Sequence, residues 1–319
     1  MHVEKNDMIV WIVFIVFVLI FLALDLGVFH KNDHVIKSKE AGIWTAIWVT
    51  VAFSFSGVIY WLFNSGMIDN PTGLTPNNAV LKYITGYLIE LSLSVDNIFV
   101  IAVIFSSFKI PPLYQHRVLF WGILGAIVFR ALMIFFGVAL ITKFEWIIYI
   151  FGIFLLYTAF NMLKGDDDDF DPKKSFVFKM IKKIYPVTSK MNGHAFFVKR
   201  MGVNAATPLF VALIVIELTD ILFALDSIPA ILAITADPFI VFTSNILAIL
   251  GLRSMYFLIS RMLEKFRYIN YSLVVILAFV GLKMLFSHYI ELPEWVSLTV
   301  ISVALASGVL ASMFIKERE

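Results

Sequence analysis

The chain has 319 residues, of which 61% are hydrophobic and 15% are charged, with a mean hydropathy of +0.91 and a formal net charge of +2. Soluble domains carry about 25% charged residues, so this composition excludes an ordinary soluble protein and indicates a polytopic helical membrane protein. The sequence contains no cysteine, which excludes disulfides and thiolate metal sites within the chain.

Nine apolar runs along the chain are each about long enough to cross a bilayer as a helix. They show no alternation of polar and apolar residues, and only helices or closed barrels satisfy their backbone in lipid, so we expect helices. The first run is too long for the apolar region of a signal peptide, and we expect it to be retained as a span. The predicted spans are 8–29, 43–63, 79–106, 117–141, 146–163, 207–235, 239–260, 270–287 and 294–315.

Lysine and arginine are distributed very unevenly between the two sides of these spans. Of the 25 lysines and arginines, three fall on the side of the N-terminus, three fall within spans, and the other 19 fall on the opposite side. Cytoplasmic loops carry an excess of these residues, so the pattern predicts an N-terminus outside and a C-terminus in the cytoplasm.

The rare charged residues of the spans recur in the same order in both halves of the chain. ELSLSVDNIFV, which starts at Glu90, corresponds to DILFALDSIPA, which starts at Asp220. Behind them, GILGAIVFRAL and NILAILGLRSM carry Arg130 and Arg253 at the same place. Each half contributes three spans, so the second copy must enter the membrane from the opposite face. This predicts a 3+3 inverted-topology repeat, which is common in secondary transporters with sites near the midplane.

The repeat predicts a division of the chain into five parts. We expect two N-terminal spans in 1–78, the first three-helix copy in 79–164, a basic cytoplasmic loop in 165–206, the second copy in 207–288, and a last span with a tail in 289–319.

The carboxylates of the spans are expensive to keep in a membrane. Each costs about 2.5–3.5 kcal/mol at the centre of a helix, and the two arginines offset only part of that cost. Four acids and two arginines leave two negative charges uncompensated, and a divalent cation or two protons would neutralise them. The acids are Glu90, Asp96, Asp220 and Asp226, and the charge-compensating residues are Arg130 and Arg253.

The donors around these acids are all hard oxygens, without a nearby histidine or cysteine. This disfavours zinc and copper and favours manganese, magnesium or calcium. Pro229 lacks an N–H, so we expect a kink and a freed carbonyl of Leu225 beside Asp226. Asp220 and Asp226 lie about 120° apart on a straight helix, so they share an ion only if the helix unwinds, and otherwise face different partners. The further donors are the Asn97 amide and the hydroxyls of Ser94, Thr219 and Ser227.

The two acidic motifs, with the arginine-bearing spans behind them, resemble the TerC family of integral membrane proteins, within the LysE-like transporter superfamily. FLALDLGVFHK, which starts at Phe21, also fits the family and adds Asp25. The length and the nine-span layout are similar to its alkaline-inducible, manganese-exporting branch. The resemblance implies export of Mn²⁺ across the bacterial inner membrane, with no resident cofactor. It implies as metal ligands Glu90, Asp96, Asn97, Asp220, Asp226 and Ser227, with weaker support for Glu217 and Asp25. The Leu225 carbonyl, which the proline suggests, is a further candidate ligand.

Other functions stay open on the sequence alone. The chain could be a Ca²⁺/H⁺ exchanger of the same superfamily, or a scaffold of a stress-resistance or protein-export complex. The acids could also be structural partners of Arg130 and Arg253. An intramembrane aspartyl protease would carry Tyr–Asp and Gly-x-Gly-Asp motifs, which are missing at these acids, and no phosphate-binding glycine loop is present. We therefore expect a transporter and not an enzyme. The name of the family refers to tellurium resistance, but no residue here suggests a direct reaction with tellurite.

The predicted loop 165–206 contains two charged segments. GDDDDFDPKK, which starts at Gly165, is interpreted as a solvated linker, or as a cation-concentrating mouth. The basic, apolar stretch from Lys173 to Tyr185 predicts either a helix on the anionic inner leaflet or a plain tether. We expect divalent cations, protons and anionic lipids as partners and no nucleic acid; the pattern fixes no oligomeric state.

Overall fold

The structure is a computed structural model that describes residues 2–29, 38–70, 72–144, 146–164, 186–188, 191, 193–200, 203–260, 268–286, 289 and 292–314. The segments Gly165–Lys174 and Lys173–Tyr185, for which the sequence suggested a mouth or linker and a lipid-binding helix, lie outside the described residues.

The described residues form nine helices, as the sequence predicts. Eight of them are long and apolar enough to cross a membrane, and α9 contains the shorter apolar stretch Tyr271–Leu285. The prediction of an all-α polytopic membrane protein is therefore confirmed. The helices are α1 (His2–Phe29), α2 (Ser38–Ser65), α3 (Pro76–Ser107), α4 (Pro112–Lys143), α5 (Ile147–Lys164), α7 (Pro208–Leu232), α8 (Pro238–Ile259), α9 (Ile269–Leu285) and α10 (Glu294–Phe314).

Proline marks the start of the four helices that make up the centre of the bundle, α3, α4, α7 and α8. The first residues of a helix have no intrahelical acceptor for their N–H groups, so proline is tolerated there and fixes a helical φ. Two of these helices also have side-chain caps. Thr75 accepts a hydrogen bond from the Asn78 N–H, and Asp237 accepts one from the Ile240 N–H.

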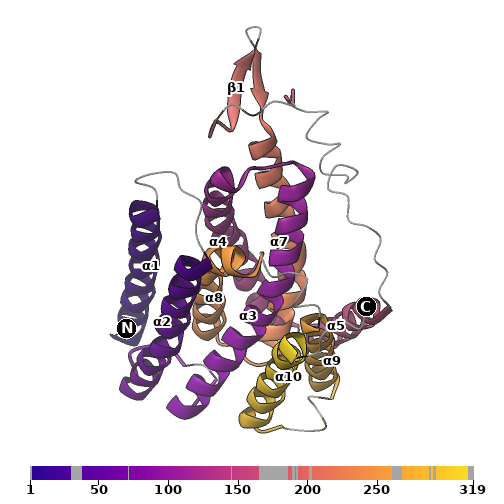
Figure 1. The fold of residues 1–319 in the computed structure, drawn as a ribbon. Coiled ribbons are helices and arrows are strands. Elements are labelled where there is room, and N and C mark those ends of the chain that lie inside the picture. Colours follow the sequence, from indigo (N-terminus) through magenta and orange to yellow (C-terminus); the bar gives the residue numbers. More distant parts are fainter. Residues whose placement is uncertain are drawn as a thin grey trace.

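The central helices are covered on two sides by the others (Figure 1). α8 is enclosed by α2, α3 and α4, and nearly all of its residues are buried. α1 packs on this side through ring contacts of Trp11 and Phe14 with Phe239. α5, α9 and α10 lie on the other side, with α10 against α3 and α9. The polar residues of the centre are therefore separated from lipid by other helices.

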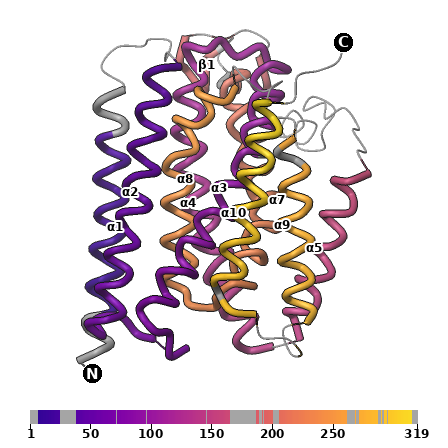
Figure 2. The backbone as a smooth tube through the Cα atoms, turned by 60° about the horizontal axis from the view of Figure 1, so that its bottom comes forward, coloured from indigo at the N-terminus to yellow at the C-terminus, as the bar shows by residue number. Residues whose placement is uncertain are grey.

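A short antiparallel hairpin projects from one end of the bundle and is absent from the sequence-based prediction, which expected only a loop over 165–206. It consists of β1 (Phe197–Arg200) and β2 (Val203–Ala206), with Phe197 opposite Ala206. The turn between α3 and α4 and the start of α7 lie at this end, and the N-terminal end of α1 lies at the other end (Figure 2). We call the first end the hairpin side.

α5 and α9, the third spans of the two predicted copies, make a reciprocal contact. A Cβ atom added at Gly152 would lie 3.0 Å from the carbonyl oxygen of Gly281, and one added at Gly281 would lie 2.9 Å from that of Gly152. Gly152 also faces Leu285, and Gly281 faces Leu156, each four residues beyond the other glycine. Two helices related by a two-fold axis would make such a contact, but the inverted repeat itself stays a prediction.

Candidate ion site in the membrane

Arg130 of α4 lies at the centre of the bundle, between carboxylates of two other helices. Its Nε donates to Oδ2 of Asp220 on α7 at 3.1 Å, and its Nη2 donates to Oδ1 of the same carboxylate at 2.8 Å. Its Nη1 donates to Oε1 of Glu90 on α3. Arg130 and Glu90 are 1% and 0% exposed, and Asp220 is also buried. A planar guanidinium that binds one carboxylate through two parallel bonds fixes its geometry closely.

Uncharged polar side chains surround this ion pair. Asn245 of α8 donates from Nδ2 to Oε2 of Glu90 at 2.8 Å, and its Oδ1 accepts from Arg130 Nη1 at 3.4 Å. Ser227 of α7 lies 3.5 Å from the same Nη1, and Asn97 of α3 donates to Oδ1 of Asp220 at 3.4 Å. Each of the four central helices thus contributes at least one polar group, and all of these side chains are buried.

The ion pair is not neutral when both acids are ionised. One arginine then faces two carboxylates, which leaves one negative charge in a region of low dielectric constant. A buried charge of this kind costs several kcal/mol unless it is paired. The cluster therefore favours binding of a further cation or of a proton.

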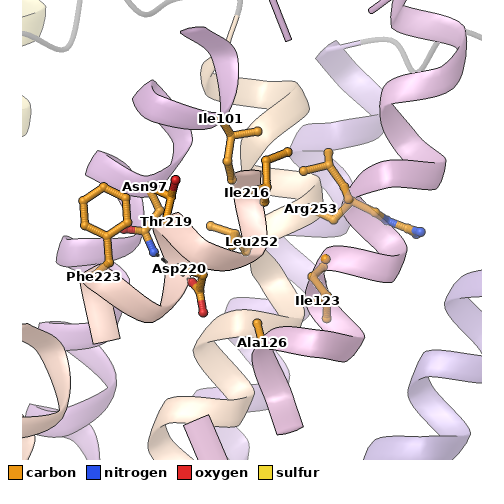
Figure 3. A pocket seen from close by; sticks show the side chains of 12 residues that line it. Asn97, Ile101, Ile123, Ala126, Ile216, Thr219, Asp220, Phe223, Leu252 and Arg253 are labelled. Carbon is orange, nitrogen blue, oxygen red and sulfur yellow. Dashed lines mark hydrogen bonds between the residues drawn. The ribbon is translucent and has the colours of Figure 1, made fainter. Parts of the chain in front are cut away.

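A small cavity of about 20 Å³ lies beside Asp220, which is room for about one water molecule or a bare ion. Asn97, Thr219 and Asp220 supply its polar lining, and small residues of α4, among them Gly122 and Ala126, leave the space open (Figure 3). The Oδ1 atom of Asn97 is buried and has no hydrogen-bond partner. It is an oxygen donor next to the carboxylate of Asp220.

The cavity lies on the hairpin side of the ion pair. On α3, which runs toward the hairpin side, Asn97 and Ile101 follow Glu90. On α7, which begins there, Ile216 and Thr219 precede Asp220. A small ion arriving from the hairpin side would therefore meet Asn97 and Asp220 before Arg130.

Asp226 does not join this cluster. Its Oδ1 accepts a hydrogen bond from the Thr158 hydroxyl of α5 at 3.0 Å, on a different side of α7 from Asp220. The 120° between the two acids therefore gives each its own partner, as a straight helix requires. α7 does not end at Pro229, where the sequence predicts a kink, and continues to Leu232. The side chain of Leu225, whose carbonyl is a predicted ligand, is 46% exposed.

The other predicted ligands either make no hydrogen bond to the ion pair or lie outside the described side chains. The side chains of Asp25 and Asp96 are not described, although their backbones belong to α1 and α3. The carboxylate of Glu217 rests against Gly125 of α4, where a Cβ atom would overlap it, and its Oε2 atom is buried without a partner. Thr219 donates its hydroxyl proton to its own helix, to the Val215 carbonyl.

The two predicted charge-compensating arginines have different surroundings. Arg130 lies between the acids, whereas the guanidinium of Arg253 points away from Asp220 in Figure 3. Arg253 Nη1 lies 3.4 Å from Nε2 of His116, near the start of α4. Arg253 lines the cavity, but its guanidinium is directed away from Asp220.

Residues 75–319 match the family described as integral membrane protein TerC, which covers well over half of the chain. The chain belongs to the TerC family. An uncharacterized membrane protein of Myxococcus xanthus is 50% identical over 308 residues, covering 97% of this chain and 92% of that protein. Relatives called putative membrane-bound redox modulator Alx, from Salmonella typhi and Photorhabdus laumondii, are each 42% identical, covering 91% and 96% of this chain and 89% and 95% of their own. No solved structure matches.

Sequence reasoning missed two polar partners in this TerC-family chain, Asn245 and Thr158. An uncharged polar residue in an apolar run is common, so neither is conspicuous alone. One signal was present for Asn245, because it opens the segment NILAILGLRSM, where the first copy has Gly122. Gly122 lines the cavity, so the missing side chain at that place helps to leave it open.

Within the described residues, no three His, Cys, Asp or Glu side chains are placed to hold a metal ion together. A metal at Glu90 and Asp220 would therefore need amide, hydroxyl or water oxygens as well. Asn97, Ser227 and Asn245 are candidates because they contact the cluster, and such mixed oxygen ligands suit Mn²⁺, Mg²⁺ and Ca²⁺.

Proposed function

We propose that this TerC-family protein is a secondary transporter that exports a divalent metal cation, Mn²⁺, from the cytoplasm. The observation that supports this most strongly is the convergence of two buried carboxylates, from α3 and α7, in the middle of the membrane helices. They carry one arginine between them and have an unpartnered amide oxygen and a cavity beside them. Ionisable groups at this depth are expensive, and they mark ion pathways in membrane proteins.

The ligand chemistry supports a hard divalent cation. Carboxylate, amide and hydroxyl oxygens are available at the cluster, and the described residues offer no nitrogen or sulfur ligand there. Manganese is our choice among the hard cations because of the resemblance to the manganese-exporting branch. Calcium in exchange for protons is the alternative that the same oxygens would serve.

The transport direction in this proposal rests on the distribution of lysine and arginine. It places the hairpin side in the cytoplasm, the N-terminus outside and the C-terminus inside. In this orientation the cavity beside Asp220 would lie on the cytoplasmic side of the ion pair, from which exported metal must enter. Rocking of one three-helix copy against the other would next expose the ion outward, and protons are the exchange partners in this proposal.

The name of the Alx relatives suggests a redox role as an alternative to metal transport. This chain contains no cysteine, so thiol–disulfide exchange has no group to act through within it. A scaffold role would require no charge cluster in the membrane. The cluster therefore favours ion transport over both.

Flux measurements in proteoliposomes test the proposal. Purified protein would be reconstituted and offered Mn²⁺, Ca²⁺ and Mg²⁺ in turn, with and without an imposed pH gradient. We expect Mn²⁺ flux above that of protein-free vesicles, and a dependence on the pH gradient if protons are exchanged. Absence of flux for all three cations would contradict transport, and a preference for Ca²⁺ would favour the exchanger.

A further inference from the structure

Arg130 occupies the oxygens that a transported cation would need. Its guanidinium binds both oxygens of Asp220 and one oxygen of Glu90. The remaining oxygen of Glu90 accepts the amide proton of Asn245. Each oxygen of the two carboxylates therefore already has a donor, and Arg130 binds three of the four, so a metal that binds both acids competes with the guanidinium for their lone pairs.

Electrostatic repulsion opposes the sharing of the two acids by the metal and the guanidinium in this geometry. With both acids ionised, the cluster with Arg130 carries one negative charge, and adding a divalent cation would leave an excess positive charge. The residues are buried, so water cannot screen the repulsion between the two cations. The repulsion between the two cations therefore favours movement of the guanidinium away from a bound divalent cation.

Arg130 also contacts two neutral acceptors, which could keep its guanidinium hydrogen-bonded after it leaves the carboxylates. Its Nη1 lies 3.4 Å from Oδ1 of Asn245 and 3.5 Å from Oγ of Ser227, which are longer contacts than those with the carboxylates. The cavity lies on the hairpin side, and on α4 it is lined by Ala126, one turn before Arg130. The metal can therefore approach Asp220 from one side while the guanidinium keeps neutral acceptors on another.

We propose that Arg130 is a displaceable counter-cation: it holds Glu90 and Asp220 together in the metal-free protein and withdraws when a divalent cation binds them. This inference rests on the proposed transport function. It goes further by giving the empty transporter a state in which both acids keep a cationic partner while the protein reorients. Arg130 then sets the affinity, because every binding event must displace it.

Equilibrium binding of Mn²⁺ to the purified full chain in detergent tests this. Free Mn²⁺ is measured by its electron paramagnetic resonance signal for the wild type, Arg130→Gln and Arg130→Lys. The competent fraction of the sites rises when the competitor is removed, so we expect Arg130→Gln to bind Mn²⁺ at least about tenfold more tightly. Arg130→Lys, which cannot bind Asp220 through two parallel bonds, should show a smaller increase in affinity. Mn²⁺ flux should fall in both, because release requires the guanidinium to return.

Arg117→Gln is the matched control, because it removes an arginine from the same helix near its start, where the guanidinium lies over the Phe196 ring. Its affinity for Mn²⁺ should equal that of the wild type. If Arg130→Gln does not fold, Arg130→Lys decides the question. Equal or weaker binding in the folded Arg130 variants would overturn the inference and leave transport standing. Absence of Mn²⁺ binding in the wild type would instead overturn the proposed function.

Discussion

Glu90 and Asp220 bind the same guanidinium from two different helices, although they are far apart in the chain. Arg130 donates two parallel bonds to Asp220 and one to Glu90, and Asn245 closes the arrangement by donating to Glu90. The pair therefore joins α3 and α7, the first helices of the two predicted copies, through a side chain of α4.

Neutralising one acid should weaken Mn²⁺ binding without unfolding the protein. In Asp220→Asn or Glu90→Gln, Arg130 keeps one carboxylate, so the cluster becomes neutral and the fold should persist. A contact to a charged group contributes about 1.5–3 kcal/mol, so Mn²⁺ affinity should fall about 10- to 100-fold. Binding and gel filtration of the purified variants measure both effects, with Glu40→Gln at the start of α2 as the control. Unchanged affinity would exclude these acids as ligands.

Removing Arg130 should be more harmful to stability than removing either acid. Arg130→Ala leaves two buried carboxylates side by side, and loss of one partner from a buried ion pair costs about 3–5 kcal/mol. Thermal unfolding in detergent should show a much lower midpoint for this variant than for Asp220→Asn. Equal midpoints would mean that the acids are already neutral in the wild type.

The Glu217 carboxylate depends on the absence of a side chain at Gly125. A methyl group at that position would overlap the carboxylate, so Gly125→Ala should destabilise the protein by about 1–3 kcal/mol. The double variant Gly125→Ala/Glu217→Ala should recover part of this loss, which a double-mutant cycle would measure. Gly57→Ala on α2, where no atom lies within 4 Å of the added methyl group, is the control. Additive effects of the two substitutions would contradict the contact.

The α5–α9 contact predicts a similar sensitivity at Gly281. A methyl group there would meet the Gly152 carbonyl oxygen at 2.9 Å and the Leu156 side chain at 3.0 Å, so the helices must separate. We expect Gly281→Ala to lower the midpoint of thermal unfolding by several degrees, relative to Gly57→Ala, for a cost of about 1–3 kcal/mol. An unchanged midpoint would show that these helices do not pack closely.

Asp237, the N-cap of α8 at the end opposite the hairpin, predicts a dependence of stability on pH. Its burial raises the pKa of the carboxyl from 3.8 to about 6, helped by Asp7 and Asp69, although hydrogen bonds from the Ile240 and Phe239 N–H groups oppose this. The folded state thus holds a proton that the unfolded state has lost, so the stability contribution is complete below about pH 4 and disappears as the pH rises through about 6.

Asp237→Asn keeps a capping side chain and removes the titration. The loss of stability between pH 4 and 7, at most about 3 kcal/mol, should therefore be smaller in this variant than in the wild type. Thermal unfolding in detergent across this pH range gives the comparison. A parallel decline in both proteins would assign the pH dependence to other groups.

The fold could be predicted well from the sequence, because the membrane imposes one strong rule. Twenty-residue apolar runs must form helices, and the number and order of the spans follow from hydropathy. The hairpin of β1 and β2 could not be predicted, since each strand has four residues and no membrane constrains it. Hydropathy reports how long an apolar run is and gives no information on the short segments between runs.

The candidate site was predictable in composition and less so in arrangement. Charged residues such as Glu90 and Arg130 are conspicuous in an apolar run, so they were found at once. That Arg130 binds both acids while Arg253 faces His116 depends on how the helices are rotated, which the positions of the charges do not fix. The separation of Asp220 from Asp226 could be anticipated from the helical angle alone.

The central claim is that Glu90 and Asp220 together bind a divalent cation inside the membrane. Locating Mn²⁺ by its anomalous scattering in crystals of the protein soaked with the metal tests it most directly. We expect a peak roughly 2–2.5 Å from carboxylate oxygens of both residues, with the Arg130 guanidinium moved away from them. Anomalous peaks confined to the surface, with Arg130 still bound to both acids at saturating Mn²⁺, would contradict the account.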